Sequence, residues 1–128
     1  PSELNRYMLS VKTLPTGKYD VSADDRALGS FTAAQLSEGV NIASTTANAW
    51  QPGGPWNAQA DALVHLTNAR SELAVGNLLS RLHLSNNPLV DELATATQPA
   101  NERLEELQRL LAKPRPYRFV VQPAKATK

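Results

Sequence analysis

The first forty residues alternate apolar and polar positions with the period of two that is typical of β-strands. A first strand is predicted over 7–11, and the Leu-Pro-Thr-Gly sequence at 14–17 favours a turn after it. A second strand over 19–23 would pair across that turn. A third over 27–31 would complete a β-meander, with a bulge at Gly29 where the apolar positions change face.

A short helix is predicted over 33–38, directly after the meander. Thr32 and Gln35 have the spacing of a capping box, in which each side chain bonds a backbone N–H of the other residue. Gly39 stands where helices commonly end on a left-handed residue. Residues 1–43 are therefore predicted to form a β-meander with one short helix, and they lead into a loop over 44–57 that is rich in glycine and proline.

Helical periodicity dominates residues 58–113. Leucine and alanine recur every three or four residues from Ala58 to about Leu82, and Asn57 is a suitable N-cap. This spacing predicts one long helix with a single apolar stripe.

A second helix is predicted to begin at Asn87 and Pro88, which suit its N-cap and first position. Pro99 lacks the N–H that continues a helix. The helix therefore either breaks near Thr97 or gives way to a third helix that begins there.

A closing strand is predicted over 117–122, where Tyr117, Phe119 and Val121 share one face. The N-terminal meander is the one predicted sheet that can pair with it. The sequence thus predicts a single α+β domain over 1–128. Its small antiparallel β-sheet, built from the meander and the C-terminal strand, packs with two or three helices.

Composition limits the classes of function. The 128 residues carry 13 Lys and Arg against 12 Asp and Glu, a net charge of +1 that argues against nucleic acid as a partner. The chain has no cysteine, which excludes disulfides and cysteine-ligated zinc. Its apolar runs are far shorter than the ~20 residues of a membrane helix, so no membrane partner is predicted. Because it begins at Pro1, we expect a processed product or a fragment.

No catalytic set is recognisable. The two histidines, His65 and His83, lie in or beside helical apolar stretches, and no Gly-x-Ser-x-Gly or Gly-Asp-Ser sequence accompanies them. No pair of histidines or carboxylates has the spacing of a known metal motif. The sequence therefore predicts no catalytic residue, no metal ligand and no cofactor.

Trp50 and Trp56 flank a Gly-Gly-Pro turn and are the one feature that resembles a ligand-binding platform. Aromatic faces stack on sugar rings, so these two residues are the candidate ligand-binding residues. In the alternative, which we favour, both tryptophans anchor the loop to the core or to a neighbouring domain.

Two stretches together resemble a known family. LPTGKYDV at 14–21 and GSFTAAQLSEGVNIA at 29–43 precede a helix with Gln59-Ala60 in its first turn. This order is similar to the C-terminal region of bacterial SGNH (GDSL-type) hydrolases. Asp25-Arg26 replaces the Asp-Gly turn of the family pattern, and the loop over 50–56 is longer than its counterpart.

The resemblance implies an accessory part of a serine esterase that acts on esters such as acylated carbohydrate. The nucleophilic serine and the Asp-x-x-His would lie upstream of Pro1, in a catalytic hydrolase domain that is the expected partner. A periplasmic or secreted location is also implied. The alternatives are a non-catalytic carbohydrate-binding module and a protein-interaction module that docks through the helix over 58–82.

Overall fold

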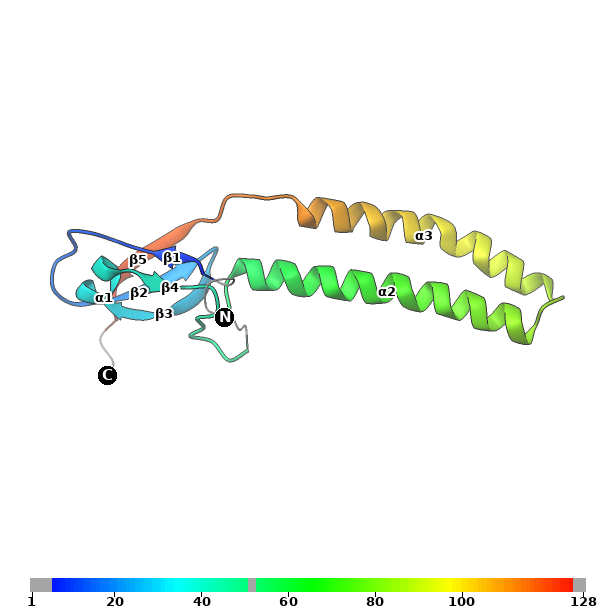
Figure 1. Cartoon of the computed structure of the whole chain (residues 1–128), viewed down its shortest axis with the longest axis horizontal. Coiled ribbons are helices and arrows are strands. Elements are labelled where there is room, and N and C mark those ends of the chain that lie inside the picture. Colours follow the sequence, from blue (N-terminus) through cyan, green and yellow to red (C-terminus); the bar gives the residue numbers. More distant parts are fainter. Residues whose placement is uncertain (1–5, 51–52, 126–128) are drawn as a thin grey trace. The chain divides into compact units, whose positions relative to one another are not determined.

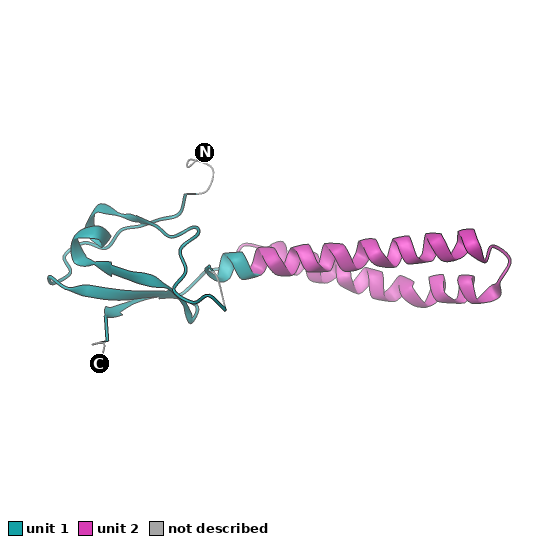
Figure 2. Ribbon diagram, turned by 90° about the horizontal axis from the view of Figure 1, so that it is seen from below, with its two compact units in different colours: residues 1–58, 115–128 teal, residues 59–114 magenta. Residues whose placement is uncertain are grey.

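The computed structural model describes residues 6–50 and 53–125. The chain divides into two compact units, residues 1–58 with 115–128 (unit 1) and residues 59–114 (unit 2), as Figure 2 shows. Unit 1 holds five strands and a short helix, and two long helices make up most of the rest (Figure 1). The predicted α+β class, with small antiparallel sheets and helices, is confirmed.

A three-stranded antiparallel sheet is the centre of unit 1. Strand β2 (Lys18–Ala23) lies between β3 (Arg26–Thr32) and β5 (Phe119–Pro123). Asp24 and Asp25 join β2 to β3 with φ values of 47° and 66°, the left-handed geometry that suits a two-residue hairpin turn. The predicted closing strand exists and pairs with β2, with Val121 opposite Val21.

The predicted bulge in the third strand is present. Val21 pairs with Gly29 and Ser22 pairs with Ala27, which leaves Leu28 as the extra residue of β3. Leu28 is 1% exposed, and Phe31 packs against the same core. The extra residue thus lets two side chains of opposite parity point to one face of the sheet.

The predicted pairing of the first strand is wrong. Strand β1 covers only Met8–Leu9, and it pairs with β4 (Val40–Asn41) in a separate two-stranded sheet. The reason is that β3 and β5 already occupy both edges of β2. The backbone beside β1 bonds instead to the segment after β3, because Val11 N donates to Leu36 O and Ile42 N donates to Tyr7 O.

Helix α1 (Ala33–Glu38) forms as predicted. Gln35 N donates to Thr32 Oγ1 and Thr32 N donates to Gln35 Oε1, so the capping box is complete. Gly39 ends the helix with φ 106° and ψ 135°, a positive φ but not the predicted left-handed helical conformation. The core of unit 1 gathers around this helix and the larger sheet: Tyr19, Val21, Ala23, Leu28, Leu36 and Ile42.

Helix α2 (Pro55–His83) begins three residues before the predicted start at Ala58. Pro55 takes the first helical position, where its missing N–H leaves no bond unmade. Asn57 is therefore inside the first turn, and its Oδ1 accepts a hydrogen bond from Gly54 N at 3.0 Å. The loop predicted over 44–57 ends at Gly54, and its residues 51 and 52 lie outside the described part of the chain.

Helix α3 (Pro88–Ala112) has Asn87 as its N-cap, as predicted, but it continues through Pro99. The predicted break near Thr97 is wrong. Asn77 of α2 donates to Thr97 Oγ1 at 3.1 Å, and Arg70 of α2 donates to Asn101 Oδ1 at 3.0 Å. These bonds hold α3 on both sides of the proline, which offsets the loss of one backbone hydrogen bond.

Candidate functional site: an aromatic groove

Aromatic side chains gather at one place in unit 1. Four of the seven aromatic residues of the chain (two Trp, three Tyr and two Phe) lie there, around Trp56. The ring centroid of Trp56 is 5.7 Å from that of Tyr7, 5.6 Å from that of Tyr117 and 6.3 Å from that of Phe119. The Tyr7 and Tyr117 rings meet it edge-on, the arrangement that aromatic pairs prefer.

This cluster lines a groove of about 430 Å³. Strand β1 with the two residues before it, the residue after β4, the start of α2, and the start of β5 with the segment before it all contribute to it. Its lining residues are Arg6, Tyr7, Met8, Leu9, Ile42, Trp56, Tyr117 and Phe119. Tyr7 is 55% exposed, Met8 48% and Phe119 41%. The groove is thus an apolar surface open to solvent, with one cationic side chain at its edge.

Trp56 is held in place by a hydrogen bond and by the close approach of the backbone before it. Its Nε1 donates a hydrogen bond to Ala43 O at 3.0 Å. A Cβ on Gly54 would collide with the Trp56 indole, so the glycine is required where the backbone passes the ring. Gly53, at φ 77°, would in the same way collide with Asn57. The Gly-Gly-Pro sequence therefore holds Trp56 in position and does not act as a flexible link.

Asp24 fixes the segment that brings Tyr117 and Phe119 to the groove. Arg118 N donates to Asp24 Oδ1 at 2.8 Å, and Arg115 Nη1 donates to Asp24 Oδ2 at 2.8 Å. Asp24 N donates in turn to Arg118 O at 2.9 Å. The Arg115 guanidinium also lies over the Tyr117 ring, 4.8 Å from its centroid. The Arg118 N–H, and then the Arg115 side chain, lower the pKa of Asp24 below its ordinary 3.8.

Asp24→Asn is expected to lower the melting temperature of unit 1 at neutral pH but not in acid. Because the pKa of Asp24 is depressed in the folded state, its contribution is present above the ordinary pKa of 3.8 and is lost as the pH falls through the folded value. Melting temperatures of both proteins, measured between pH 7 and pH 2.5, should therefore still differ near pH 4 and converge only as the pH falls further below 3.8.

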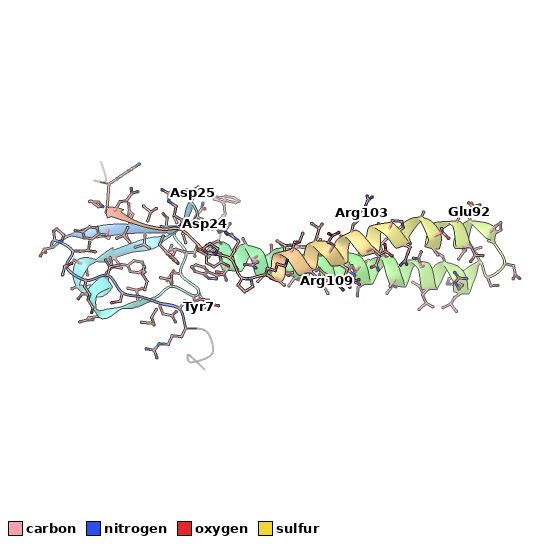
Figure 3. The ribbon with its side chains drawn as sticks, turned by 90° about the horizontal axis from the view of Figure 1, so that it is seen from above. Tyr7, Asp24, Asp25, Glu92, Arg103 and Arg109 are labelled. Carbon is pink, nitrogen blue, oxygen red and sulfur yellow. The ribbon has the colours of Figure 1, made fainter. Side chains whose placement is uncertain are left out.

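Asp25→Asn is the matched control for this prediction. Asp25 is the other residue of the same turn, and Asn tolerates the left-handed conformation of both positions. Figure 3 labels the two carboxylates side by side on the hairpin. A stability difference for Asp24→Asn that stayed constant with pH, or an equal effect of Asp25→Asn, would show that the ion pair does not hold the segment.

The two predicted ligand-binding residues are not brought together. Trp56 lies in the groove, whereas Trp50 does not line it and is 94% exposed. Asn48 Oδ1 accepts a hydrogen bond from Trp50 N at 2.9 Å, which shapes the loop but leaves the indole in solvent. Trp56 thus anchors the loop to the core of this chain, whereas Trp50 does not. That Trp50 anchors the loop to a neighbouring domain stays a prediction.

Sequence reasoning missed most of the groove. It assigned Tyr7, Tyr117 and Phe119 to ordinary strand faces, and it gave no role to Arg6 or Met8. One signal was available in the sequence. Only 5% of the chain is aromatic, yet Tyr7, Tyr117 and Phe119 all lie within eleven positions of an end of the chain.

The described residues offer no assembled catalytic or metal site. His65 Nε2 lies 3.5 Å from Asp61 Oδ1 one helical turn earlier, but the two side chains are 75% and 73% exposed on α2. Within 6–50 and 53–125 no group of three or more histidines and carboxylates could hold a metal ion. In the same described ranges no helix is both long enough and apolar enough to cross a membrane.

The chain was compared with known proteins in three ways. No family model matches it, and no curated protein matches it. A solved structure of a gut microbial diltiazem-metabolizing enzyme has a similar fold, with a TM-score of 0.59 and 20% sequence identity. The similarity covers 93% of this chain and 34% of that enzyme, so this chain spans about one third of the enzyme's length. At this identity the likeness concerns the fold alone.

Proposed function

We propose that this chain is the C-terminal accessory part of an SGNH-type hydrolase, and that its aromatic groove docks on the catalytic domain of the same parent protein. The observation that carries the proposal is the fold similarity, which spans 93% of this chain but only 34% of a larger enzyme. The residues at 14–21 and 29–43 supply the link to SGNH hydrolases. Catalysis would then belong to the parent, on esters such as acylated carbohydrate.

The shape of the groove favours a protein surface over a sugar as its occupant. Sugar binding by stacking needs one flat, open ring face. Tyr7 and Tyr117 meet the Trp56 ring at 61° and 72°, and the indole N–H is already used by Ala43 O. A methionine such as Met8 beside aromatic rings is instead typical of apolar docking surfaces, because the unbranched methionine side chain adapts to irregular partners.

A carbohydrate-binding module is the second candidate, and Trp50 is the observation that favours it. An indole that is 94% exposed on a loop offers the open face that the groove lacks. In this alternative Trp50 alone stacks on a sugar ring, and Trp56 only supports the loop.

The first test is the natural form of the protein. Intact mass and N-terminal sequencing should reveal a longer chain with an upstream Gly-Asp-Ser sequence. Residues 1–128 alone should not hydrolyse p-nitrophenyl acetate above a heat-treated control. Turnover that disappears in His65→Ala or His83→Ala would place a catalytic site inside this chain and contradict the proposal.

The second test separates docking from sugar binding. The upstream region, expressed separately and titrated with residues 1–128, should blue-shift the Trp56 emission as the groove is covered. Met8→Glu should weaken this binding at least about tenfold, because it buries a charge in an apolar contact. Trp50→Ala should leave it unchanged. A response to added oligosaccharide that Trp50→Ala abolishes would support the binding module instead.

A further inference from the structure

A regular stripe of exposed side chains runs along the surface of α3. Its positions are alternately four and three residues apart, the spacing of a seam between two helices. This free stripe comprises Leu89, Leu93, Ala96, Ala100, Arg103, Leu107 and Leu110. Its leucines are between 47% and 65% exposed, and the stripe is about 33 Å long at 1.5 Å per residue.

The free stripe is not the surface that α3 turns toward α2. That surface is the neighbouring stripe, one residue further along at each position, and it is buried or half-buried: Val90, Ala94, Thr97, Asn101, Leu104, Gln108 and Leu111. Much of it is polar, and Arg70 bonds there to Asn101, Glu105 and Gln108. Val90, 6% exposed, is the only buried residue in unit 2, whose residues are all described. The packing of α3 on α2 therefore leaves the most regular leucine stripe of α3 uncovered. An uncovered apolar stripe of this kind is typical of an interaction surface.

The order of large and small side chains along the free stripe is complementary to the same stripe of a second molecule. We propose that α3 pairs with α3 of another molecule of this chain, antiparallel and about a two-fold axis. Residues whose numbers add to 196 then face each other. Leu89 meets Leu107 of the partner copy, and Ala96 meets Ala100 of the partner copy. A pair of leucines thus lies at each end of the contact, and four alanines at its centre let the two helices approach closely.

The charges fit the same register. Arg103 interrupts the leucines and has no hydrogen bond or ion pair within the described chain, and the same is true of Glu92. Figure 3 shows both side chains on one side of α3, with Arg109 on another. In the proposed pair Arg103 lies over Leu93 of the partner copy and next to its Glu92. The two-fold axis repeats this contact, which gives two ion pairs between the copies.

The contact is a small one. In this register Leu110 extends past the partner helix, because residue 86 precedes α3. The seam from Leu89 to Leu107 is about 28 Å long and lies at the low end of interface sizes, which is typical of transient association. The expected behaviour is therefore a reversible dimer with a Kd in the micromolar range. No part of the argument depends on the proposed accessory role.

Sedimentation of the full 128-residue chain should show a monomer–dimer equilibrium at micromolar concentration. Arg103→Glu and Glu92→Arg should each weaken self-association at least about tenfold, because each places like charges together twice. An equimolar mixture of the two variants should recover a dimer, since each Glu then faces an Arg. Arg109→Glu, which reverses a charge that pairs with Glu105 within α3, is the control and should leave the dimer intact.

Cross-linking tests the register. The chain has no cysteine, so Ala96→Cys and Ala100→Cys introduce unique thiols. A mixture of the two should form a disulfide-linked heterodimer faster than either alone. Circular dichroism verifies that each variant keeps its helices. A chain that stays monomeric up to millimolar concentration, a dimer indifferent to both charge reversals, or a mixture that fails to recover the dimer would overturn the proposal.

Discussion

Removal of residues 114–128 is expected to unfold unit 1. The deletion takes away β5 and leaves the central strand β2 paired with β3 alone, so the backbone from Tyr19 to Ala23 loses its partners on one side. It also removes Val121 from the core and Tyr117 and Phe119 from Trp56. Full burial of one such side chain stabilises by about 1.5–3 kcal/mol. Even partial burial of three therefore approaches the 5–15 kcal/mol stability of a whole small domain.

Calorimetry and near-UV circular dichroism check this expectation. The truncated chain should show no cooperative transition from unit 1, whereas the helices of unit 2 keep a far-UV signal. Deletion of residues 126–128 alone is the control, because it spares every strand. If the chain without residues 114–128 melts within a few degrees of the intact chain, β5 is dispensable for the fold.

Trp56→Ala is expected to destabilise unit 1 strongly, and Trp50→Ala is expected to have almost no effect. Trp56 packs against three aromatic rings and the core, and it donates a hydrogen bond to Ala43 O. Its truncation should cost about 3 kcal/mol, the lower end for a tryptophan because the ring is only half-buried. Trp50 is 94% exposed, and surface substitutions of this kind stay within about 0.5 kcal/mol.

Scanning calorimetry of the two variants measures the difference directly. Trp56→Ala should melt at least about 10 °C lower than the unaltered chain, since about 1 kcal/mol moves the transition of a domain this size by 4–8 °C. Trp56→Phe keeps an aromatic ring but not the N–H, so it separates the packing from the hydrogen bond. Equal melting temperatures for Trp50→Ala and Trp56→Ala would mean that the aromatic cluster does not stabilise the fold.

The sequence by itself determined the elements whose signals are local. The Thr32–Gln35 capping box placed α1 at its true bounds, and Asn87 with Pro88 marked the start of α3. The change of apolar face at Gly29 indicated the bulge in β3. These features succeed because the interacting groups lie within a few residues of each other, so their spacing along the chain is their geometry.

Only the tertiary structure decided which distant segments meet. β1 pairs with β4 because β3 and β5 occupy both edges of β2, a competition that no local pattern records. α3 passes through Pro99 because α2 supplies bonds on both sides of it, against the helix-breaking tendency of proline. The aromatic groove joins residues from both ends of the chain, so it exists only once β5 has returned to the sheet. Local propensity is worth up to about 1 kcal/mol per residue, and about 3 kcal/mol for proline, and the burial and bonding of whole segments outweigh it.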